Sequence, residues 1–302
     1  MRAIVTGGAG FIGSHVAEAL VAREDEVIVV DDLSSGKRAN VPEGARLVEL
    51  DIRDSALGDL FAEMRPEVCF HLAAQASVTV SVDRPDHDAD VNVLGTIRVL
   101  EAARGSNTQL VFSSTGGAIY GDCDGPMPED SPRRPLSPYG VSKLAGEEYL
   151  ALYNRLYGSR HVAVRYANVY GPRQDPHGEA GVVAIFFGRL RNGEPCRIFG
   201  DGRQTRDYVY VGDAVRAALA AVGHAGGVFN VGTGVETSVL ELYELCRRTG
   251  GSEAEAERAP ARPGEAQRSV VDPSLAAAEL GWVPEVSLED GLRATWQSLA
   301  SA

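Results

Sequence analysis

The sequence predicts an α/β fold in which a doubly wound parallel sheet carries a smaller C-terminal lobe. In the first half of the 302-residue chain, short apolar runs alternate with segments of helical periodicity, which is the pattern of strands joined by crossover helices. After about Tyr166 the segments shorten and turns become frequent, as at Gly171-Pro172 and Gly200-Asp201-Gly202. The chain length also favours one large domain with a smaller lobe.

Seven apolar runs are the expected strands of the large sheet. They are residues 3–6, 27–31, 47–50, 68–72, 110–113, 161–165 and 228–231. The last of these runs is expected to return to the sheet from the second part of the chain.

Helices are expected between these runs and near the C-terminus. The segment 138–157 has the best-defined ends, because Ser137 suits the N-cap, Pro138 suits the first helical position and Gly158 closes the helix. The apolar residues at helical spacing after the first strand are Ile12, Val16, Ala19 and Leu20. Further helices are expected at 90–104, 238–249 and 288–299, and a loop with at most one strand at 250–268.

Composition limits the classes of function. The formal net charge of −13 argues against a nucleic-acid surface, and a phosphorylated substrate would need local positive charge to offset it. We expect no membrane span, since no apolar stretch approaches about 18 residues, and no signal peptide, which favours the cytoplasm. The cysteines show no metal-ligand spacing, so we expect reduced thiols and no metal site; they are Cys69, Cys123, Cys196 and Cys246.

A glycine loop follows the first expected strand. Gly7, Gly10 and Gly13 form a G-x-x-G-x-x-G pattern that allows a tight turn, close approach of the backbone to a pyrophosphate, and a helix N-terminus facing the phosphates. Alone, the loop is equally compatible with an ordinary strand–helix turn. Asp31 and Asp32 end the second strand, where an acid binds the adenosine ribose and disfavours a 2′-phosphate. Together these features predict an NAD site in a Rossmann-type domain.

Other strand ends are expected to complete that site. Asp51-Ile52 would flank the adenine, and Leu72-Ala73-Ala74 would lie beside the pyrophosphate and ribose. Lys37 and Arg38 would soften the preference for NAD if they faced the ribose, but they are explained more simply as surface charges. We expect residues 1–165, with a returning segment at about 207–233, to form the NAD-binding domain. Residues 166–206 and 234–302 would form the substrate-binding lobe.

Tyr139 and Lys143 are the candidate reaction centre. They stand four residues apart at the start of a helix and therefore share a face. An ammonium beside a phenol is expected to lower the pKa of the phenol from about 10, which would make a base for a hydroxyl proton. A Tyr-x-x-x-Lys spacing also arises by coincidence. Here Lys37 and Lys143 are the only lysines among many arginines, which indicates a need for an ammonium.

A hydroxyl-rich segment precedes this helix. The strand 110–113 runs into Ser114-Thr115-Gly116-Gly117, at the carboxyl end of a central strand where open α/β sheets bind ligands. These hydroxyls are also suited to capping their own turn. With Tyr139 and Lys143 close behind, a Ser/Thr–Tyr–Lys triad is the better interpretation.

On these motifs the chain resembles the extended short-chain dehydrogenase/reductase family, and within it the UDP-glucose (galactose) 4-epimerases. The resemblance runs nearly from end to end. It covers residues 6–13 and 31–35, Asn92-Val93-Leu94-Gly95-Thr96, residues 139–143 and 165–171, Arg206-Asp207-Tyr208 and Arg262-Pro263-Gly264. It implies a Rossmann-type fold, NAD as cofactor, and inversion of C4 of a UDP-hexose by transient oxidation.

The resemblance also implies roles for matching residues. Tyr139 would be the acid/base, Lys143 its electrostatic partner, and Thr115 the hydroxyl that binds the substrate oxygen. Because Gly116-Gly117 add one residue relative to the commoner epimerase loop, that hydroxyl maps to Ser114 or Thr115, and we assign it to Thr115. The residues assigned to NAD are Gly7, Gly10, Phe11, Ile12, Gly13, Asp31, Asp32, Asp51, Ile52, Leu72, Ala73, Ala74, Asn92, Ser113, Tyr139, Lys143 and Tyr166.

Arg206 and Arg262 would supply the local positive charge that a phosphorylated substrate needs, because a guanidinium matches phosphate geometry. Ser269 stands where a bulky aromatic residue blocks N-acetyl groups in restricted epimerases, so activity on UDP-N-acetylhexosamines is expected as well. The residues assigned to the UDP-sugar are Ser114, Thr115, Tyr139, Asn168, Val182, Val183, Ile198, Phe199, Arg206, Arg262, Glu265 and Ser269. For Phe199, a place beside the uracil and a place in the core are both open.

Related activities remain as alternatives. Sugar-nucleotide dehydratases and decarboxylases of the superfamily carry an acid directly after the loop hydroxyl. This chain has Gly116 and Gly117 at that place, so a base is missing and both activities are disfavoured. A UDP-glucuronate 4-epimerase would share the whole triad and stays open, as does a non-catalytic NAD sensor. The resemblance also implies a homodimer through helices near 90–104 and 138–157, although Val93, Ile97 and Leu100 would equally suit packing on the sheet.

Overall fold

The computed structural model describes residues 1–176, 181–261 and 266–300. Seven parallel strands form one large sheet in the order β10-β6-β5-β4-β1-β2-β3. Their bounds are Arg2–Thr6 for β1, Glu26–Asp31 for β2, Arg46–Glu49 for β3, Val68–His71 for β4, Gln109–Thr115 for β5, Val162–Tyr166 for β6 and Gly227–Val231 for β10. The predicted doubly wound sheet is confirmed, including the return of its last strand. The order reverses between β1 and β4, which is where such sheets bind ligands.

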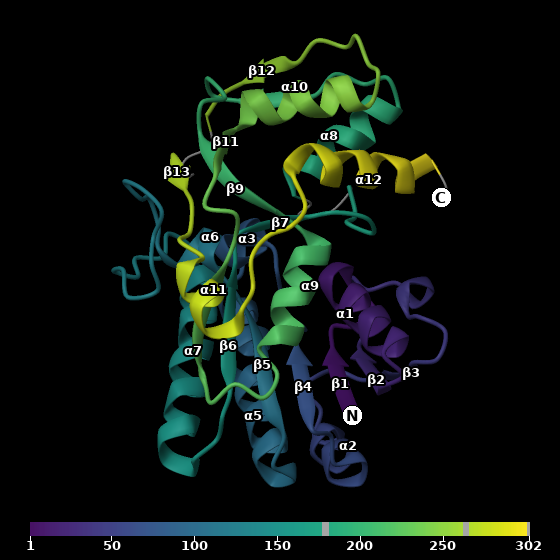
Figure 1. The fold of residues 1–302 in the computed structure, drawn as a ribbon, viewed down its shortest axis with the longest axis vertical. Coiled ribbons are helices and arrows are strands. Elements are labelled where there is room, and N and C mark those ends of the chain that lie inside the picture. The colour runs from purple at the N-terminus through teal and green to yellow at the C-terminus, as the bar shows by residue number, and fades with distance from the viewer. Residues whose placement is uncertain (177–180, 262–265, 301–302) are drawn as a thin grey trace.

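Helices cover both faces of this sheet (Figure 1). One face packs on α1 (Phe11–Ala22), α9 (Val211–Ala220) and α11 (Ser274–Leu280), which contribute residues such as Leu20 and Ala217 to one buried cluster. The other face packs on α2 (Ala56–Met64), α5 (Gly95–Ser106) and α7 (Pro138–Tyr157), which contribute Phe61, Leu100 and Leu150 to a second cluster. Because both faces are covered, the strands of this sheet consist largely of apolar residues.

The smaller lobe is built on a second sheet of four strands. In it β9 (Thr205–Tyr210) pairs with β7 (Asn168–Tyr170), β11 (Glu236–Ser238) and β13 (Arg268–Ser269). A further pair joins β8 (Arg197–Phe199) to β12 (Glu257–Ala259). Of these two strands, β12 lies in the segment 250–268, where a loop with at most one strand was expected. The third buried cluster lies here, where α8 (Val182–Arg191), α10 (Val239–Thr249) and α12 (Leu288–Ala300) meet.

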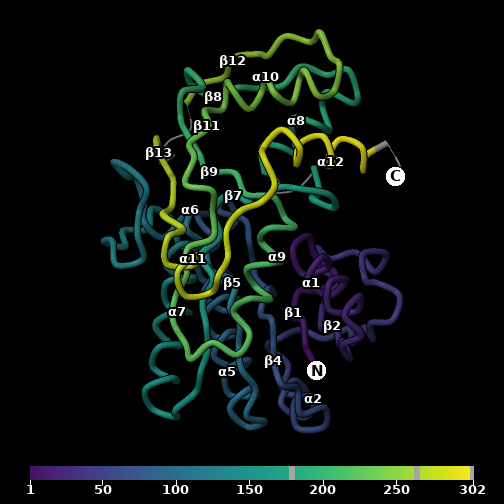
Figure 2. Tube along the Cα trace, in the orientation of Figure 1, coloured from purple at the N-terminus to yellow at the C-terminus, as the bar shows by residue number. Residues whose placement is uncertain are grey.

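The chain passes between the two parts more than once. Figure 2 shows the C-terminal segment descending from β13 to α11 beside the large sheet and then rising to α12 in the lobe. Accordingly, Ala276 and Trp282 are buried with the large sheet, whereas Leu292 is buried in the lobe. Of the segment at 207–233, β10 lies in the large sheet, whereas the first part continues β9 of the smaller one.

The helix expected at 90–104 has a different start. Residues Asp90–Leu94 form a π-helical turn, η2, and the α-helix begins only at Gly95. The Thr96 hydroxyl donates to the Asn92 carbonyl oxygen over 2.6 Å, and the Asn92 side chain is turned inward and buried. Turns of this type frequently occur at functional sites. Across the residues described, no helix combines the length and hydropathy needed to cross a membrane.

Two short helices lie between β4 and this π-turn. They are α3 (Val78–Asp83), capped by the Ser77 hydroxyl, and α4 (Pro85–Ala89). A further short helix, α6 (Gly116–Ile119), follows β5 and packs against the start of α7. These three helices place the loops after β4 and β5 beside Tyr139.

Candidate active site

The glycine loop joins β1 to α1 at the carboxyl edge of the large sheet. Gly7 has φ of +69°, and a Cβ there would stand 2.6 Å from the Ala73 backbone nitrogen. A Cβ at Gly13 would run into the Gly7 carbonyl oxygen. Helix α1 begins at Phe11 without a side-chain cap, so its first N–H groups and its positive dipole end face the loop. This cradle fits a dinucleotide pyrophosphate.

The acids at the end of β2 also shape the loop. Asp31 is buried and accepts hydrogen bonds from the backbone N–H groups of Ala9 and Leu33, both 2.9 Å long. Asp32 is exposed and accepts from the backbone and hydroxyl of Ser34. A carboxylate has about four acceptor positions, so Asp31 keeps capacity for ribose hydroxyls. This donor and acceptor set fits NAD.

The two nearby cations are paired with acids. Lys37 Nζ lies 2.9 Å from Asp175, and Arg38 lies 2.5 Å from Glu49. Both are exposed, as expected for surface charges. The Lys37 pair links the loop after β2 to the segment after β7.

The other residues assigned to NAD follow β3, β4 and β5. Asp51 forms a bidentate pair with Arg53, whose guanidinium lowers the pKa of that carboxyl. Ile52 is buried beside Gly95, and the Ala73 N–H donates to the Thr6 hydroxyl over 3.3 Å. Leu72 and Ala74 adjoin Ala73 at the same edge, and Tyr166 is buried at the end of β6, opposite Thr115.

A buried histidine joins two of these strand ends. His71 Nδ1 lies 2.7 Å from the Thr6 hydroxyl, and Nε2 lies 3.1 Å from the Thr96 hydroxyl. Because Thr96 donates to the Asn92 carbonyl, it must accept from His71, so the histidine carries its proton on Nε2. Burial lowers the pKa of His71 to about 3, with Lys143 acting in the same direction. The ring is therefore neutral at ordinary pH.

Tyr139 and Lys143 lie in the first turns of α7, as their spacing predicted. Ser137 caps the helix through the Gly140 N–H, and Pro138 takes the first position. The Lys143 ammonium donates to the Ser113 carbonyl oxygen over 2.9 Å and stands 5.9 Å from the centre of the Tyr139 ring. The Tyr139 hydroxyl makes no hydrogen bond to any residue that the structure describes, so it is available to a ligand.

The electrostatic environment differs from the expectation. Burial raises the pKa of Tyr139 to about 12, and the charge of Asp88 acts in the same direction. Burial lowers the pKa of Lys143 to about 8, against the opposing effects of Asp88 and Glu147. The expectation that the neighbouring ammonium lowers the pKa of the phenol is therefore contradicted for the residues of this chain by themselves, because spacing does not reveal how strongly the site is desolvated.

The hydroxyls at the end of β5 have different surroundings. Ser114 is buried and donates to Glu147 Oε1 over 2.5 Å. Glu147 in turn forms a bidentate pair with Arg165, with distances of 2.9 and 2.6 Å. The Thr115 hydroxyl makes no hydrogen bond among the described residues and faces Gly117, on the same side as the Asn168 amide.

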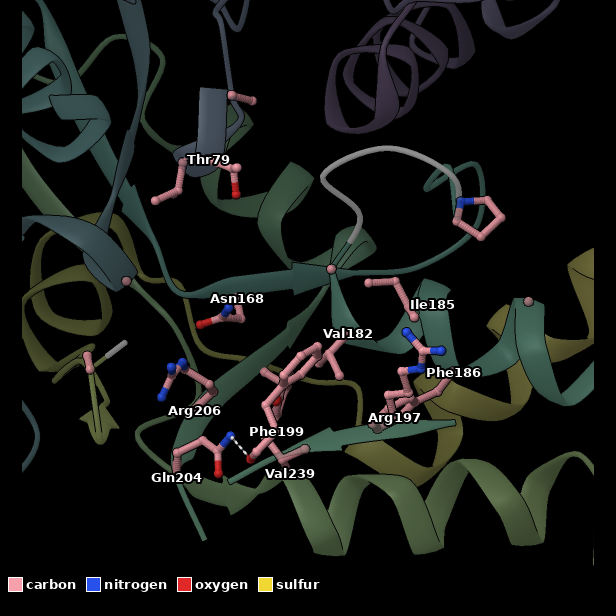
Figure 3. Close-up of a pocket in the computed structure, with 18 of the residues that line it drawn as sticks. Thr79, Asn168, Val182, Ile185, Phe186, Arg197, Phe199, Gln204, Arg206 and Val239 are labelled. Carbon is pink, nitrogen blue, oxygen red and sulfur yellow. Dashed lines mark hydrogen bonds between the residues drawn. The ribbon is translucent and has the colours of Figure 1, made fainter. Parts of the chain in front are cut away.

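A cavity of about 1270 Å³ runs from this point into the lobe. Its inner end is lined by the neighbours of the predicted triad, Gly117, Ala118 and Ser137, rather than by Thr115 or Tyr139 themselves. Its lobe end carries Arg189, Arg191, Arg197 and Arg206. Figure 3 shows Asn168, Arg206 and Phe199 around the opening, with the Gln204 amide donating to the Phe199 carbonyl oxygen over 3.1 Å.

The residues assigned to the sugar nucleotide are only partly brought together. Asn168, Val182, Phe199 and Arg206 line the cavity. The side chains of Val183 and Ile198 are instead buried in the core of the lobe, and Ser269 is buried on β13 opposite Arg206. Arg262 and Glu265 lie outside the described residues.

Several residues around the site were not anticipated. Gln75 and Asp88 form a hydrogen-bonded cluster beside α7 with Asn92, which was assigned to NAD, and the cavity lining includes Thr79 and Gln204. The one signal in the sequence was the four-residue spacing of Asp88 and Asn92, which places both on one helix face. The described residues contain no group of three His, Cys, Asp or Glu side chains arranged to hold a metal ion.

Comparison with known proteins shows the family to which the chain is similar. The sequence profile of the NAD dependent epimerase/dehydratase family matches residues 3–232. A UDP-glucose 4-epimerase of Mycolicibacterium smegmatis is 49% identical over 98% of this chain and 97% of its own length. A putative UDP-glucose 4-epimerase of Methanocaldococcus jannaschii is 47% identical over 96% of this chain and 95% of its own.

Solved structures of UDP-glucose 4-epimerases have the same fold as this chain. The crystal structure of UDP-glucose 4-epimerase with UDP-glucose from Thermotoga maritima has a TM-score of 0.98 at 48% identity, covering 100% of this chain and 99% of that one. The UDP-glucose 4-epimerase of Thermus thermophilus in complex with NAD has a TM-score of 0.96 at 47% identity, covering 100% of both chains. The chain therefore belongs to the NAD-dependent epimerase/dehydratase family, within the extended short-chain dehydrogenase/reductase group that its motifs predicted.

Proposed function

We propose that this protein is an NAD-dependent 4-epimerase of UDP-hexoses that interconverts UDP-glucose and UDP-galactose. The observation that carries the proposal is the pair of uncommitted hydroxyls, Tyr139 and Thr115, beside a buried ammonium and next to the residues that line the inner end of the cavity. The arginines at its other end suit a diphosphate. Similarity to UDP-glucose 4-epimerases over nearly the whole chain supports the same activity.

In this proposal the residues of the chain handle protons and orientation. NAD, when bound, supplies a hydride acceptor and donor beside C4 of the sugar. Tyr139 as phenolate takes the proton of the 4-hydroxyl and later returns it to the same oxygen, so no net proton is consumed. Thr115 holds that oxygen, and Lys143 stabilises the phenolate. The positive charges of the nicotinamide ring and of Lys143 would oppose the rise in the pKa of Tyr139 that burial causes.

The lobe would hold the nucleotide while the oxidised sugar turns. Arg206 on β9 and Phe199 on β8 lie on one side of the cavity, and Asn168 lies between them and the large sheet. Fixing the diphosphate at the lobe leaves the hexose free to present either face. We propose on this basis that the large sheet is the NAD-binding part and the lobe the UDP-sugar-binding part, with Arg262 and Glu265 among its ligands.

We further propose that UDP-N-acetylhexosamines are substrates. Ser269 is small and adjoins Arg206 across the strand pair, and Ala266 lines the cavity nearby. A Ser269→Tyr variant should keep turnover of UDP-galactose and lose turnover of UDP-N-acetylglucosamine. Equal loss of both activities would instead point to a role of Ser269 in the lobe itself.

The proposed activity is tested by incubating the purified protein with UDP-galactose and no added cofactor. Product formation is followed by the anomeric proton resonances, with Tyr139→Phe as the matched control. The proposal expects conversion to UDP-glucose until an equilibrium mixture is reached. Failure to convert either hexose, together with turnover of UDP-glucuronate, would transfer the assignment to the glucuronate epimerases.

We propose a homodimer that uses the outer faces of α5 and α7. Val141 and Leu156 on α7 and Leu94 before α5 are large apolar side chains that are at least 51% exposed. Their exposure supports a partner along these helices, which are the ones that the resemblance assigns to the dimer. Light scattering should give twice the chain mass of 32.1 kDa, and Leu156→Glu should shift the mass toward that of the monomer. For the location we propose the cytoplasm, supported by the four buried cysteines, which are all free thiols.

A further inference from the structure

A fully buried carboxylate lies directly behind the Tyr139 turn. Asp88 on α4 has no solvent exposure. Its Oδ1 accepts from the Gln75 amide over 2.8 Å and from the Asn92 amide over 2.9 Å, and its Oδ2 accepts from the Ser142 hydroxyl over 2.6 Å. All three donors are neutral, and no ion pair to Asp88 occurs within the described part of the chain. A buried charge without a paired cation is costly.

The hydrogen bonds at Oδ1 show that this oxygen of Asp88 is an acceptor only. The side-chain oxygen Oδ1 of Asn92 accepts the Gln75 backbone N–H, which fixes the orientation of the Asn92 amide and makes its nitrogen face Asp88. The Gln75 side-chain oxygen accepts the Ser77 N–H, which fixes the second amide in the same way. Two N–H donors therefore point at one oxygen, an arrangement that a carboxylate satisfies.

The charge lies next to the proposed reaction centre. Ser142 is the neighbour of Lys143 and follows Tyr139 by three residues, so its bond to Asp88 fixes the helix turn that carries both. Other titratable groups face this turn. His71 on β4 is neutral, and Glu147 on α7 is already paired with Arg165. Asp88 is thus the unneutralised negative charge on this side of Lys143.

Burial and this charge act on Lys143 in opposite directions. The pKa of Lys143 is lowered to about 8, because desolvation outweighs the opposite effects of Asp88 and Glu147. Without Asp88, the side chain would lose its proton closer to neutral pH. The same charge disfavours the Tyr139 phenolate, so the two requirements of the site conflict. A site that keeps such a charge holds the proton of Lys143 to higher pH, and its phenol is less acidic.

We propose that Asp88 is a positioning residue of the reaction, whose buried negative charge keeps Lys143 as an ammonium and whose bond to Ser142 fixes the turn that presents Tyr139. The inference deepens the proposed function and rests on it for the role of Lys143. It assigns a task to a residue outside the Ser/Thr–Tyr–Lys set. Asp88 acts through Lys143 and touches neither sugar nor dinucleotide in this scheme.

The chain is well suited to a direct test, because Lys37 and Lys143 are its only lysines. Labelling with lysine carrying ¹³C at Cε gives two resonances, assigned with a Lys37→Arg variant. Their pH titration in the purified holoenzyme reports the charge of each ammonium, independently of any turnover. Lys37 is exposed and serves as the internal control.

Asp88→Asn is the decisive variant. Asn keeps the shape, its oxygen accepts from both amides, and its nitrogen donates to the Ser142 hydroxyl, so only the charge is lost. We expect the Lys143 midpoint to fall by about one pH unit while the Lys37 midpoint stays unchanged. The basic limb of the kcat–pH profile should move in the same direction. Ser142→Ala, which keeps the charge, should leave the Lys143 midpoint in place.

An unchanged Lys143 midpoint in Asp88→Asn, or an equal shift in Ser142→Ala, would overturn the inference. If Asp88→Asn does not fold, the wild-type titration still decides, since a Lys143 that is already neutral at pH 7 contradicts the proposal. If the Lys143 midpoint shifts as expected but the wild-type protein epimerises no UDP-sugar, the effect of Asp88 on Lys143 is supported and the proposed function is overturned.

Discussion

Behind the inner end of the cavity the charged groups are buried, whereas at the lobe end they are arginines that line the cavity. Lys143 is 4% exposed and Asp88 has no exposure, but the Arg197 side chain is 59% exposed. Fixed charges in a low dielectric act strongly on a nearby proton. Exposed forked cations bind a diphosphate with little reorganisation of the fold. The comparison therefore separates chemistry from anchoring, and variants at the two ends should fail in different ways.

The largest effect is expected at the inner end, on turnover. Tyr139→Phe removes the acid/base and should lower kcat about 10³- to 10⁴-fold. Binding of UDP-galactose, measured by calorimetry, should change little, because the proposed function assigns the binding of the nucleotide to the lobe. Loss of binding in parallel with turnover would show that the two ends do not act separately.

The buried pair behind β5 should have a large effect on stability. Arg165→Met leaves Glu147 charged and unpaired, and should lower the free energy of unfolding by about 3–5 kcal/mol. Replacing both partners, as in Arg165→Met with Glu147→Leu, should recover most of this loss, since no isolated charge remains. Urea unfolding at fixed protein concentration measures both. Equal destabilisation of the single and double variants would contradict this account of the pair.

At the lobe end, the expected effect is on KM. Arg206→Ala should raise KM for UDP-galactose about 10- to 100-fold and leave kcat within a small factor, since a charge-assisted hydrogen bond contributes about 1.5–3 kcal/mol. Arg206→Lys should recover only part of the loss, because an ammonium lacks the planar fork. A fall in kcat with normal KM would place Arg206 in the chemistry instead.

A separate effect, felt only in acid, is on the pH dependence of stability. His71 is neutral in the fold because burial lowers its pKa to about 3, whereas in the unfolded chain it takes up a proton below its ordinary value of 6.5. The unfolded state then binds the extra proton, so stability falls as pH drops from 6.5 toward 3, by up to about 1.4 kcal/mol per pH unit. In His71→Gln, the slope of unfolding free energy against pH should be shallower by that amount. Matching slopes would show that His71 is protonated in the fold.

Local signals in the sequence predicted the large sheet, the glycine loop and the Tyr139–Lys143 pair. The glycine loop at Gly7 to Gly13 and the Tyr139–Lys143 spacing depend on neighbours within one or two turns, and both lie where expected. The π-turn at 90–94 was not predicted, because it depends on contacts of Asn92 with Gln75, 17 residues away in sequence. The raised pKa of Tyr139 was missed for a similar reason, since burial is a tertiary property.

The lobe shows the same limit at the level of single side chains. Ile198 and Phe199 are neighbours on β8, and successive residues of a strand face opposite sides. The sequence could not say which of the two faces the core. In the structure Ile198 is buried and Phe199 lines the cavity. Val182 and Val183 divide in the same way at the start of α8, with Val182 on the cavity side.

The central claim is that hydrogen leaves C4 of the sugar as hydride and returns to the same carbon within one site. UDP-glucose carrying deuterium at C4, incubated with the purified protein in ordinary water, tests it directly. The account predicts UDP-galactose that keeps the deuterium at C4, as read by mass spectrometry and NMR. Replacement of the label by solvent hydrogen would contradict it.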